Sequence, residues 1–161
     1  PAISKQQPVP LEALNEIVKI IGLAKVSLSA HEARTMRFLQ PHDRIVAHKG
    51  QLLSVAKAMV RQMPVRRVDQ ARIYAVGAQG RAALTLGLSH MHESGLLSDY
   101  DHELGLTLAK VICGGDNDQP QWVSHTHLLA LEHAAFTHLV VQPKTLERII
   151  YTLKNGKPLR N

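Results

Sequence analysis

Cysteine, aromatic residues and long apolar runs are all scarce in this sequence. Cys113 is the single cysteine, which excludes an intramolecular disulfide and fits a reducing, cytoplasmic compartment. Aromatic residues make up 4% of the chain while Ala and Leu are abundant, a balance that favours helix over strand. No run of 18 apolar residues occurs, so no membrane-spanning helix is predicted. A chain of 161 residues is still long enough to bury a core of its own.

Acidic residues are fewer than basic ones, at 13 against 19, which leaves a net charge of +6. Such a balance suits nucleic acid, an anionic membrane or an anionic metabolite. The basic residues are spread along the chain, apart from Arg61 and the pair Arg66-Arg67, and aromatic residues do not alternate with them. A nucleic-acid surface needs that clustering. We therefore predict no nucleic-acid partner and a surface that suits a phosphate-bearing ligand.

The signatures of common catalytic and metal sites are also missing. The sequence contains no HExxH, no Cys–His zinc spacing, no GxGxxG, no GxxxxGK[ST] and no GxSxG. Among its ten histidines, His90 and His92 are two positions apart, which places them on different sides of a helix. Cys113 precedes two glycines and has no evident base nearby. We predict neither a metal site nor a catalytic residue in this chain.

Apolar residues recur at helical spacing along most of the sequence. Ser29 and Glu32 have the spacing of a capping box, and Gly95 and Gly156 suit the left-handed residue that ends a helix. Helices are predicted over residues 11–24, 30–38, 51–63, 80–94, 99–112, 125–141 and 143–155.

Strands are expected to be few and short. Residues 25–28 and 44–48 are the candidates, while residues 65–78 read as a connector and residues 116–121 as a polar loop. No alternation of strand and helix follows residue 50, so a doubly wound nucleotide-binding sheet is not expected. The prediction is a mainly α fold with six or seven helices and at most one or two short strands. Residues 1–10 read as a linker or a cut end, and residues 11–161 as one helical part.

Residues 143–161 carry the most specific pattern. Pro143 suits the first turn of a helix, Leu146 and Leu153 belong to one apolar stripe, and Gly156 and Pro158 end the helix. The pattern alone indicates a terminal amphipathic helix. With the ending Gly-Lys-Pro-Leu-Arg-Asn, it resembles the C-terminal signature KTxERIxxxLxxGKPLRN of bacterial bifunctional 3-hydroxyacyl-CoA dehydrogenase/enoyl-CoA hydratase proteins of fatty-acid β-oxidation.

Three earlier blocks strengthen this resemblance. Residues 24–46 are similar to the family's AKVSxSAxEA…LxxxDRIV, the local form of a general crotonase segment. Residues 80–116 are similar to GxxAL…GxxSxxD…LAxVxxGGD, and a third block, from residue 128 to 136, leads into the ending. Together the blocks cover nearly everything from residue 11 to 161. Arg37 departs from the general crotonase pattern, which has Gly there, so the local turn and the nearby acyl-pocket wall are expected to differ.

The resemblance implies that the chain is the helical C-terminal part of a crotonase-like domain in a cytoplasmic lipid-metabolism enzyme. The parent would hydrate 2-enoyl-CoA and oxidise 3-hydroxyacyl-CoA with NAD. Upstream parts of the same polypeptide would supply the catalytic groups, so the isolated chain is expected to be inactive and to bind no cofactor alone. Tyr151 and Lys154 fall where crotonases place an aromatic residue and a Lys near CoA, which makes them the expected CoA contacts.

A second interpretation belongs to a different class. The chain could be a non-enzymatic helical binding or assembly module, and the residues encoded before Pro1 would discriminate between the two. On the enzyme interpretation, helices that normally cover a catalytic core would leave an exposed apolar surface or a homo-oligomer contact.

Overall fold

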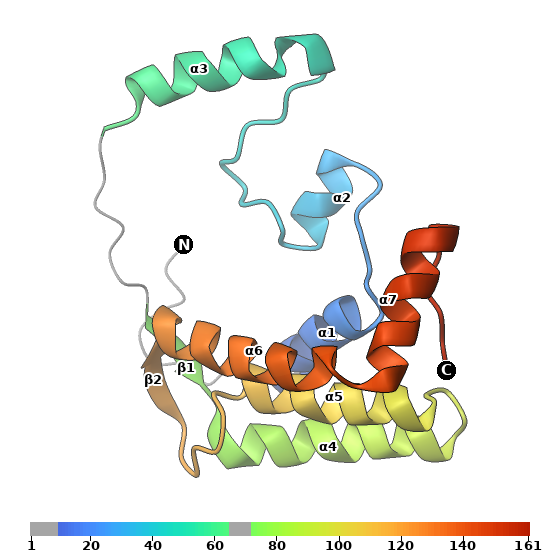
Figure 1. The fold of residues 1–161 in the computed structure, drawn as a ribbon. Coiled ribbons are helices and arrows are strands. Elements are labelled where there is room, and N and C mark those ends of the chain that lie inside the picture. The colour runs from blue at the N-terminus through green and yellow to red at the C-terminus, as the bar shows by residue number, and fades with distance from the viewer. Residues whose placement is uncertain (1–9, 65–71) are drawn as a thin grey trace. The chain divides into compact units, whose positions relative to one another are not determined.

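The computed structural model describes residues 10–64 and 72–161 of the chain (Figure 1). The described part contains seven α-helices and one two-stranded sheet, so the predicted mainly α fold is confirmed. It divides into two compact units. One comprises residues 1–24 with 70–161, and the other comprises residues 25–69. None of the helices in the described ranges is long and apolar enough to cross a membrane.

Five helices build the first unit. α4 (Gly77–Glu93) and α5 (Asp99–Ile112) lie side by side, and α1 (Leu11–Gly22) packs against both of them (Figure 1). α6 (His125–Val140) packs on α5, and α7 (Pro143–Asn155) contacts α6. All five were predicted as helices, and α4 begins three residues before the predicted start.

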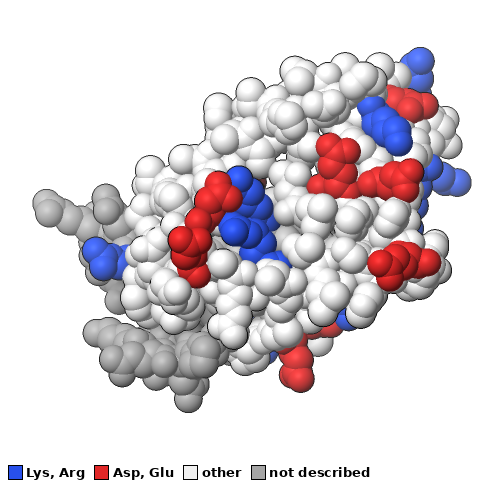
Figure 2. All heavy atoms as spheres, turned by 90° about the horizontal axis from the view of Figure 1, so that it is seen from below, with Lys and Arg blue, Asp and Glu red and all other residues white. Residues whose placement is uncertain are grey.

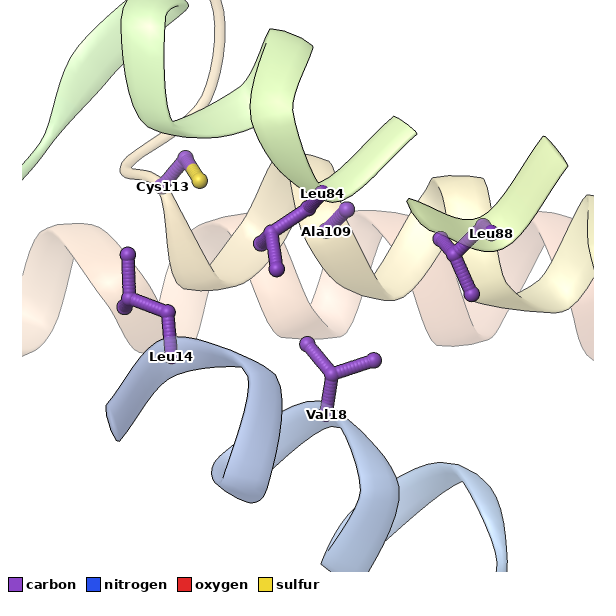
Figure 3. Close-up of a cluster of buried hydrophobic side chains, with 6 residues drawn as sticks. All are labelled: Leu14, Val18, Leu84, Leu88, Ala109 and Cys113. Carbon is purple, nitrogen blue, oxygen red and sulfur yellow. The ribbon is translucent and has the colours of Figure 1, made fainter. Parts of the chain in front are cut away.

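The core of this unit lies where α1 meets α4 and α5. Leu84, Ala109 and Cys113 are at most 1% exposed. Leu14 and Val18, one turn apart on α1, point toward them (Figure 3). Burial raises the pKa of the Cys113 thiol, against the opposing charge of Arg81. Cys113 is therefore a core residue at the end of a helix, where burial outweighs the charge of Arg81 and disfavours a reactive thiolate.

The two strands differ in place from those predicted. β1 (Arg72–Ala75) pairs antiparallel with β2 (Gln121–Ser124), and Tyr74 packs edge-on against Trp122 at 5.3 Å between ring centroids. β1 lies inside the stretch predicted to be a connector, whose residues 65–71 fall outside the described part. The predicted strands at 25–28 and 44–48 do not form. Each observed strand is only four residues long and depends on a distant partner, so local pattern could not reveal it.

The predicted helix ends are confirmed at most positions. Glu32 accepts a hydrogen bond from the Leu28 amide at 2.6 Å, one residue before the N-cap that a strict capping box would contact. Gly95 and Gly156 have φ values of 76° and 63°, the left-handed conformation predicted for helix ends. Three serines accept a hydrogen bond from the amide three residues on: Ser29, Ser98 and Ser124.

The second unit holds the shorter helices α2 (Ala30–Thr35) and α3 (Leu52–Gln62), the latter preceded by the 3₁₀ turn η1 (Lys49–Gln51). Ala33 is its one buried hydrophobic residue among those described, and no residue of α3 is buried. Arg37 has a φ of 63°, the region that glycine favours. The departure from the crotonase pattern therefore still occupies a glycine-like backbone conformation.

Gly114 should tolerate no side chain. It has a φ of 91°, and an added Cβ would lie 2.5 Å from the Cβ of Ala75. We expect Gly114→Ala to lower the free energy of unfolding by about 2–5 kcal/mol, because left-handed strain adds to an overpacked contact. Urea denaturation followed by circular dichroism would measure the loss.

Gly95→Ala is the matched control, since Gly95 has a φ of 76° with nothing within 4 Å of an added Cβ. This substitution should lower the free energy of unfolding by about 1–2 kcal/mol, the cost of left-handed backbone strain alone. Equal losses in the two variants would contradict the packing role of Gly114.

Candidate functional site

Arg148 on α7 ties three parts of the first unit together. Its Nη1 donates to Asp101 Oδ1 on α5 at 2.7 Å, and its Nε donates to the side-chain oxygen of Asn161 at the same distance. Its Nη2 donates to the main-chain oxygen of Asn161 at 3.1 Å. The side chains of Arg148 and Asp101 are each only 18% exposed, so this is a largely buried ion pair in which each guanidinium nitrogen donates one hydrogen bond.

Asn161 forms the other side of this contact, and we call Arg148, Asp101 and Asn161 together the Arg148 anchor. Its main-chain oxygen accepts a hydrogen bond from the Ser98 hydroxyl at 3.0 Å, and its side-chain amide donates to Glu147 Oε2 at 2.6 Å. The residues after Gly156 therefore fold back and attach to α7 and to the start of α5. The ending that looked like a family signature has a structural role in this chain, and the sequence offered no sign of its partners.

Tyr100 lies beneath the same contact. The residue is 4% exposed, and its hydroxyl hydrogen-bonds the Thr145 hydroxyl. The Arg148 guanidinium lies 5.0 Å and the Lys144 ammonium 5.5 Å from the centre of its ring. Two cations close to the Tyr100 ring strengthen the attachment of α7 to α5.

Asp101 carries a shifted pKa because of this environment. Burial alone raises the pKa of the carboxyl, but the hydrogen bonds from Arg148 and Ser98 and the charge of Arg148 outweigh burial and hold the pKa below its ordinary value. The carboxylate form is thus the one that the fold stabilises.

A cavity of about 300 Å³ opens beside the anchor. Its wall combines the end of α1 with α4, α5 and α6, and most of it is apolar, including Ile21, Met91, Leu97 and Leu104. The charged residues at the cavity are Lys19, Asp101, Arg148 and Arg160. A smaller hollow of about 180 Å³ lies between the first turns of α5 and α7. Sequence analysis identified neither hollow, because their walls come from segments far apart in the chain.

Tyr151 and Lys154, the residues predicted to contact CoA, lie three positions apart in the second half of α7. Both are exposed, with Tyr151 at 39%, so both are accessible to a ligand. Neither lines the two hollows described above. Their contact with CoA stays a prediction.

A cluster of His92, His102, Asp99 and Ser89 invites a catalytic interpretation. His92 pairs with Asp99 at 2.7 Å, and its ring stacks on that of His102. Ser89 lies 3.4 Å from His102 Nε2. The carboxylate therefore orients one histidine while the serine faces the other, which does not make a Ser-His-Asp relay. In the described ranges, no three His, Cys, Asp or Glu side chains gather to hold a metal ion.

The glycine turn at residues 113–116 is occupied by contacts within the chain. The Gly114 carbonyl accepts hydrogen bonds from Asn117 at 2.8 Å and from the His127 ring at 3.1 Å. Arg81 and Lys110 both pair with Asp116. On the face shown in Figure 2, basic and acidic side chains likewise lie next to one another, without a separate basic field. The turn is therefore a structural feature rather than an anion site.

Comparison with known proteins supplies one relative. The chain is 35% identical, over 159 aligned residues, to the probable 3-hydroxyacyl-CoA dehydrogenase of Bacillus subtilis (strain 168). The alignment covers 94% of this chain but 20% of that protein, so the chain spans about a fifth of its relative's length. No family model matches the chain, and no solved structure matches it. The similarity supports the dehydrogenase half of the resemblance, whereas the relative's name says nothing of a hydratase.

The ion pair between Asp101 and Arg148 should give stability a specific pH dependence. The pKa of Asp101 is lower in the folded state than in the unfolded state. Its contribution to the free energy of unfolding is therefore present above the unfolded pKa of about 3.9 and is lost as the pH falls through the folded pKa. At pH 7, Asp101→Asn should cost about 1.5–3 kcal/mol, the value of a hydrogen bond to a charged group. Denaturation curves from pH 7 to pH 2.5 should show the gap to wild type narrowing below pH 4.

Asp118→Asn serves as the control, since Asp118 is exposed and makes no hydrogen bond or ion pair with the described residues. Its effect on stability should stay within about 0.5 kcal/mol. A gap for Asp101→Asn that is constant over the whole pH range would show that the carboxylate charge is not what stabilises the anchor.

Proposed function

We propose that this chain is the helical part of a larger enzyme of fatty-acid β-oxidation that oxidises 3-hydroxyacyl-CoA with NAD and hydrates 2-enoyl-CoA. The observation that carries the proposal is the 35% identity to a probable 3-hydroxyacyl-CoA dehydrogenase along 94% of the chain. The hydratase activity rests on the crotonase-like sequence blocks alone. Since the match spans a fifth of the relative, we assign the catalytic groups and the NAD site to the remainder of such a polypeptide.

The polar clusters of the described residues support a non-catalytic role for this chain in the larger enzyme. Arg148 binds both Asp101 and Asn161, and the glycine turn is occupied by Arg81 and His127. Hydration requires donors aimed at a developing oxyanion and carboxylates within about 3 Å of the reacting atoms. Groups whose hydrogen bonds are already satisfied within the fold are poorly suited to either role.

Exposed apolar residues support the proposal that α3 and α7 pack against a partner. On α3, Leu53 is 66% and Val60 69% exposed, and on α7 Leu153 is 82% exposed. Burying such side chains contributes about 25 cal/mol per Å² of apolar surface. We assign the upstream part of the same polypeptide as the partner for these faces, with homo-oligomer formation as a further consequence of the same surface.

The end of α7 is suited to the phosphate groups of CoA. A helix C-terminus repels anions through the unsatisfied carbonyls of its last turn. Lys154 in that turn and Lys157 just beyond it offset this repulsion with exposed positive charge. Tyr151 adds an exposed aromatic surface on which an adenine ring could stack. We therefore propose that Tyr151 and Lys154 contribute uniform binding of CoA rather than chemistry.

A domain exchange tests the proposal. The matching fifth of the Bacillus protein would be deleted, or replaced by this chain, and assayed for crotonyl-CoA hydration and NAD-dependent 3-hydroxybutyryl-CoA oxidation. We expect the deletion to lack hydration, the exchange to regain it, and the isolated 161-residue chain to show neither activity. Robust turnover by the isolated chain, or full hydration by the deletion, would contradict the proposed division of labour.

Substitutions at the CoA contacts should separate binding from chemistry. In the exchanged protein, Tyr151→Ala and Lys154→Ala should each raise the KM for acyl-CoA about fivefold with little change in kcat, because an exposed contact contributes about 1 kcal/mol to both ground and transition states. The Lys154 effect should shrink as salt rises. Lys57→Ala removes the same charge from α3 and should leave KM unchanged. An unaltered KM in both variants would remove Tyr151 and Lys154 from the site.

A further inference from the structure

Helix α7 is attached to the first unit by its polar side. Arg148 donates to Asp101 on α5, and the Thr145 hydroxyl hydrogen-bonds that of Tyr100. The Lys144 ammonium lies 5.5 Å from the centre of the Tyr100 ring. Because a helix turns by about 100° per residue, the three attaching residues of α7 share one side of it. The side of α7 that faces the rest of the unit is therefore the polar one.

The other side of α7 carries its large apolar residues. We call this row the α7 stripe: Leu146, Ile149, Ile150 and Leu153. The exposed fractions of these residues lie between 39% and 82%. A helix at the surface of a globular protein normally buries its apolar side, and α7 does the reverse. A contiguous apolar row that faces solvent marks a surface that another protein covers.

The α7 stripe is symmetric about the midpoint between Ile149 and Ile150. Reversing the direction of the helix exchanges Leu146 with Leu153 and one Ile with the other, which reproduces the same row. Two antiparallel copies related by a two-fold axis at this midpoint therefore match Leu with Leu and Ile with Ile. Such self-complementarity is what an isologous contact between identical chains requires. The spacing i, i+3, i+4, i+7 suits two helices that cross at about 20°.

The charges beside the α7 stripe favour the same arrangement. Glu147 and Lys154 lie two turns apart along one edge of the stripe, and both are exposed. In an antiparallel pair this edge meets the same edge of the second copy, which brings each Glu147 near the other copy's Lys154. A parallel pair would instead set this edge against the one that holds Thr152, which offers no opposite charge.

These two side chains have the capacity for the contact in addition to their other roles. Asn161 donates to one oxygen of Glu147, Oε2, which leaves Oε1 for a second partner. An ammonium has three donors, so pairing with Glu147 leaves Lys154 donors for a phosphate. The intermolecular ion pair is therefore compatible with the binding role proposed for Lys154.

We propose that α7 forms a homodimer contact, in which the α7 stripes of two copies of this chain pack antiparallel about a two-fold axis between Ile149 and Ile150. The proposal specifies the homo-oligomer named under the proposed function and rests on that part of it alone, while the upstream polypeptide remains the partner of α3. The stripe is about 10 Å long, so the contact buries less than the roughly 1,200 Å² of a stable interface. The dimer of the 161-residue chain is accordingly weak and concentration-dependent.

Sedimentation equilibrium of the 161-residue chain tests the contact. From about 5 μM to about 1 mM, the weight-average mass should rise from 17.8 kDa toward twice that value. Ile150→Glu should raise the dimer Kd at least about tenfold, and Leu153→Glu should do the same if Ile150→Glu fails to fold. Val60→Glu is the matched control on α3 and should leave the Kd unchanged. A chain that stays monomeric, or equal weakening by Val60→Glu, overturns the proposal.

Cysteine cross-linking tests the antiparallel direction. In the proposed dimer position 146 of one copy faces position 153 of the other, whereas two copies of the same position lie about 10 Å apart along the axis, beyond the reach of a disulfide. An oxidised mixture of Leu146→Cys and Leu153→Cys should therefore form covalent dimers in higher yield than either variant alone. Wild type is the control for Cys113, which is fully buried. Equal yields from Leu153→Cys alone and from the mixture overturn the antiparallel arrangement.

A charge exchange tests the ion pairs. Glu147→Lys should raise the dimer Kd about tenfold, because it opposes two lysines across the contact. Adding Lys154→Glu to the same chain restores opposite charges and should return the Kd toward that of wild type. Glu12→Lys makes the same change of net charge on α1 and should have no effect. Failure of the double variant to recover overturns the charge pairing. All three tests measure association rather than turnover, so the dimer and the enzymatic role can fail independently.

Discussion

The close contact between α4 and α5 is the constraint on which the first unit depends. Gly105 lies directly under Leu88, so that an added Cβ would be 2.9 Å from a Leu88 methyl group. Ala109, one turn further along α5, is fully buried beside Leu84. Small residues on one helix let large residues of the other approach its backbone, and α1 then closes the remaining side. The glycine turn, the two-stranded sheet and the cavity all take their positions from this packing.

The second organising contact is polar and lies at the edge of the core. Arg148 reaches both Asp101 on α5 and Asn161 at the end of the chain, so α7 and the tail that follows it are attached as one piece. A largely buried guanidinium stabilises the fold only when it is paired, and both Asp101 and Asn161 accept hydrogen bonds from it. Because α7 is held in this way, Tyr151 and Lys154 project from a helix whose attachment to α5 is well defined. The same attachment places Arg160 in the lining of the cavity.

The two units differ in how much of their own apolar surface they bury. The first has a continuous core, whereas the second has Ala33 as its one buried hydrophobic residue among those described. α3 nevertheless has apolar residues on one side and Lys57 and Arg61 on the other. This is the pattern of an amphipathic helix whose apolar side packs against another surface. The proposal that a larger polypeptide covers this surface rests on the similarity to a fifth of a larger dehydrogenase. The proposed function follows from that agreement between surface and similarity.

Sequence by itself determined where the helices lie and several of their ends. Ser29, Ser98 and Ser124 cap helices through the amide three residues on, and Gly95 and Gly156 end them, so each signal and its effect lie within one helical turn. Tertiary structure alone decided that β1 pairs with β2, that Arg148 meets Asp101 from 47 positions away, and that residues of five helices line one apolar cavity. Those features join distant segments, and the local sequence pattern of one segment does not predict its contact with the other. They arise only when the helices pack, because a contact between distant residues is stabilised by burial and pairing that neither residue possesses alone.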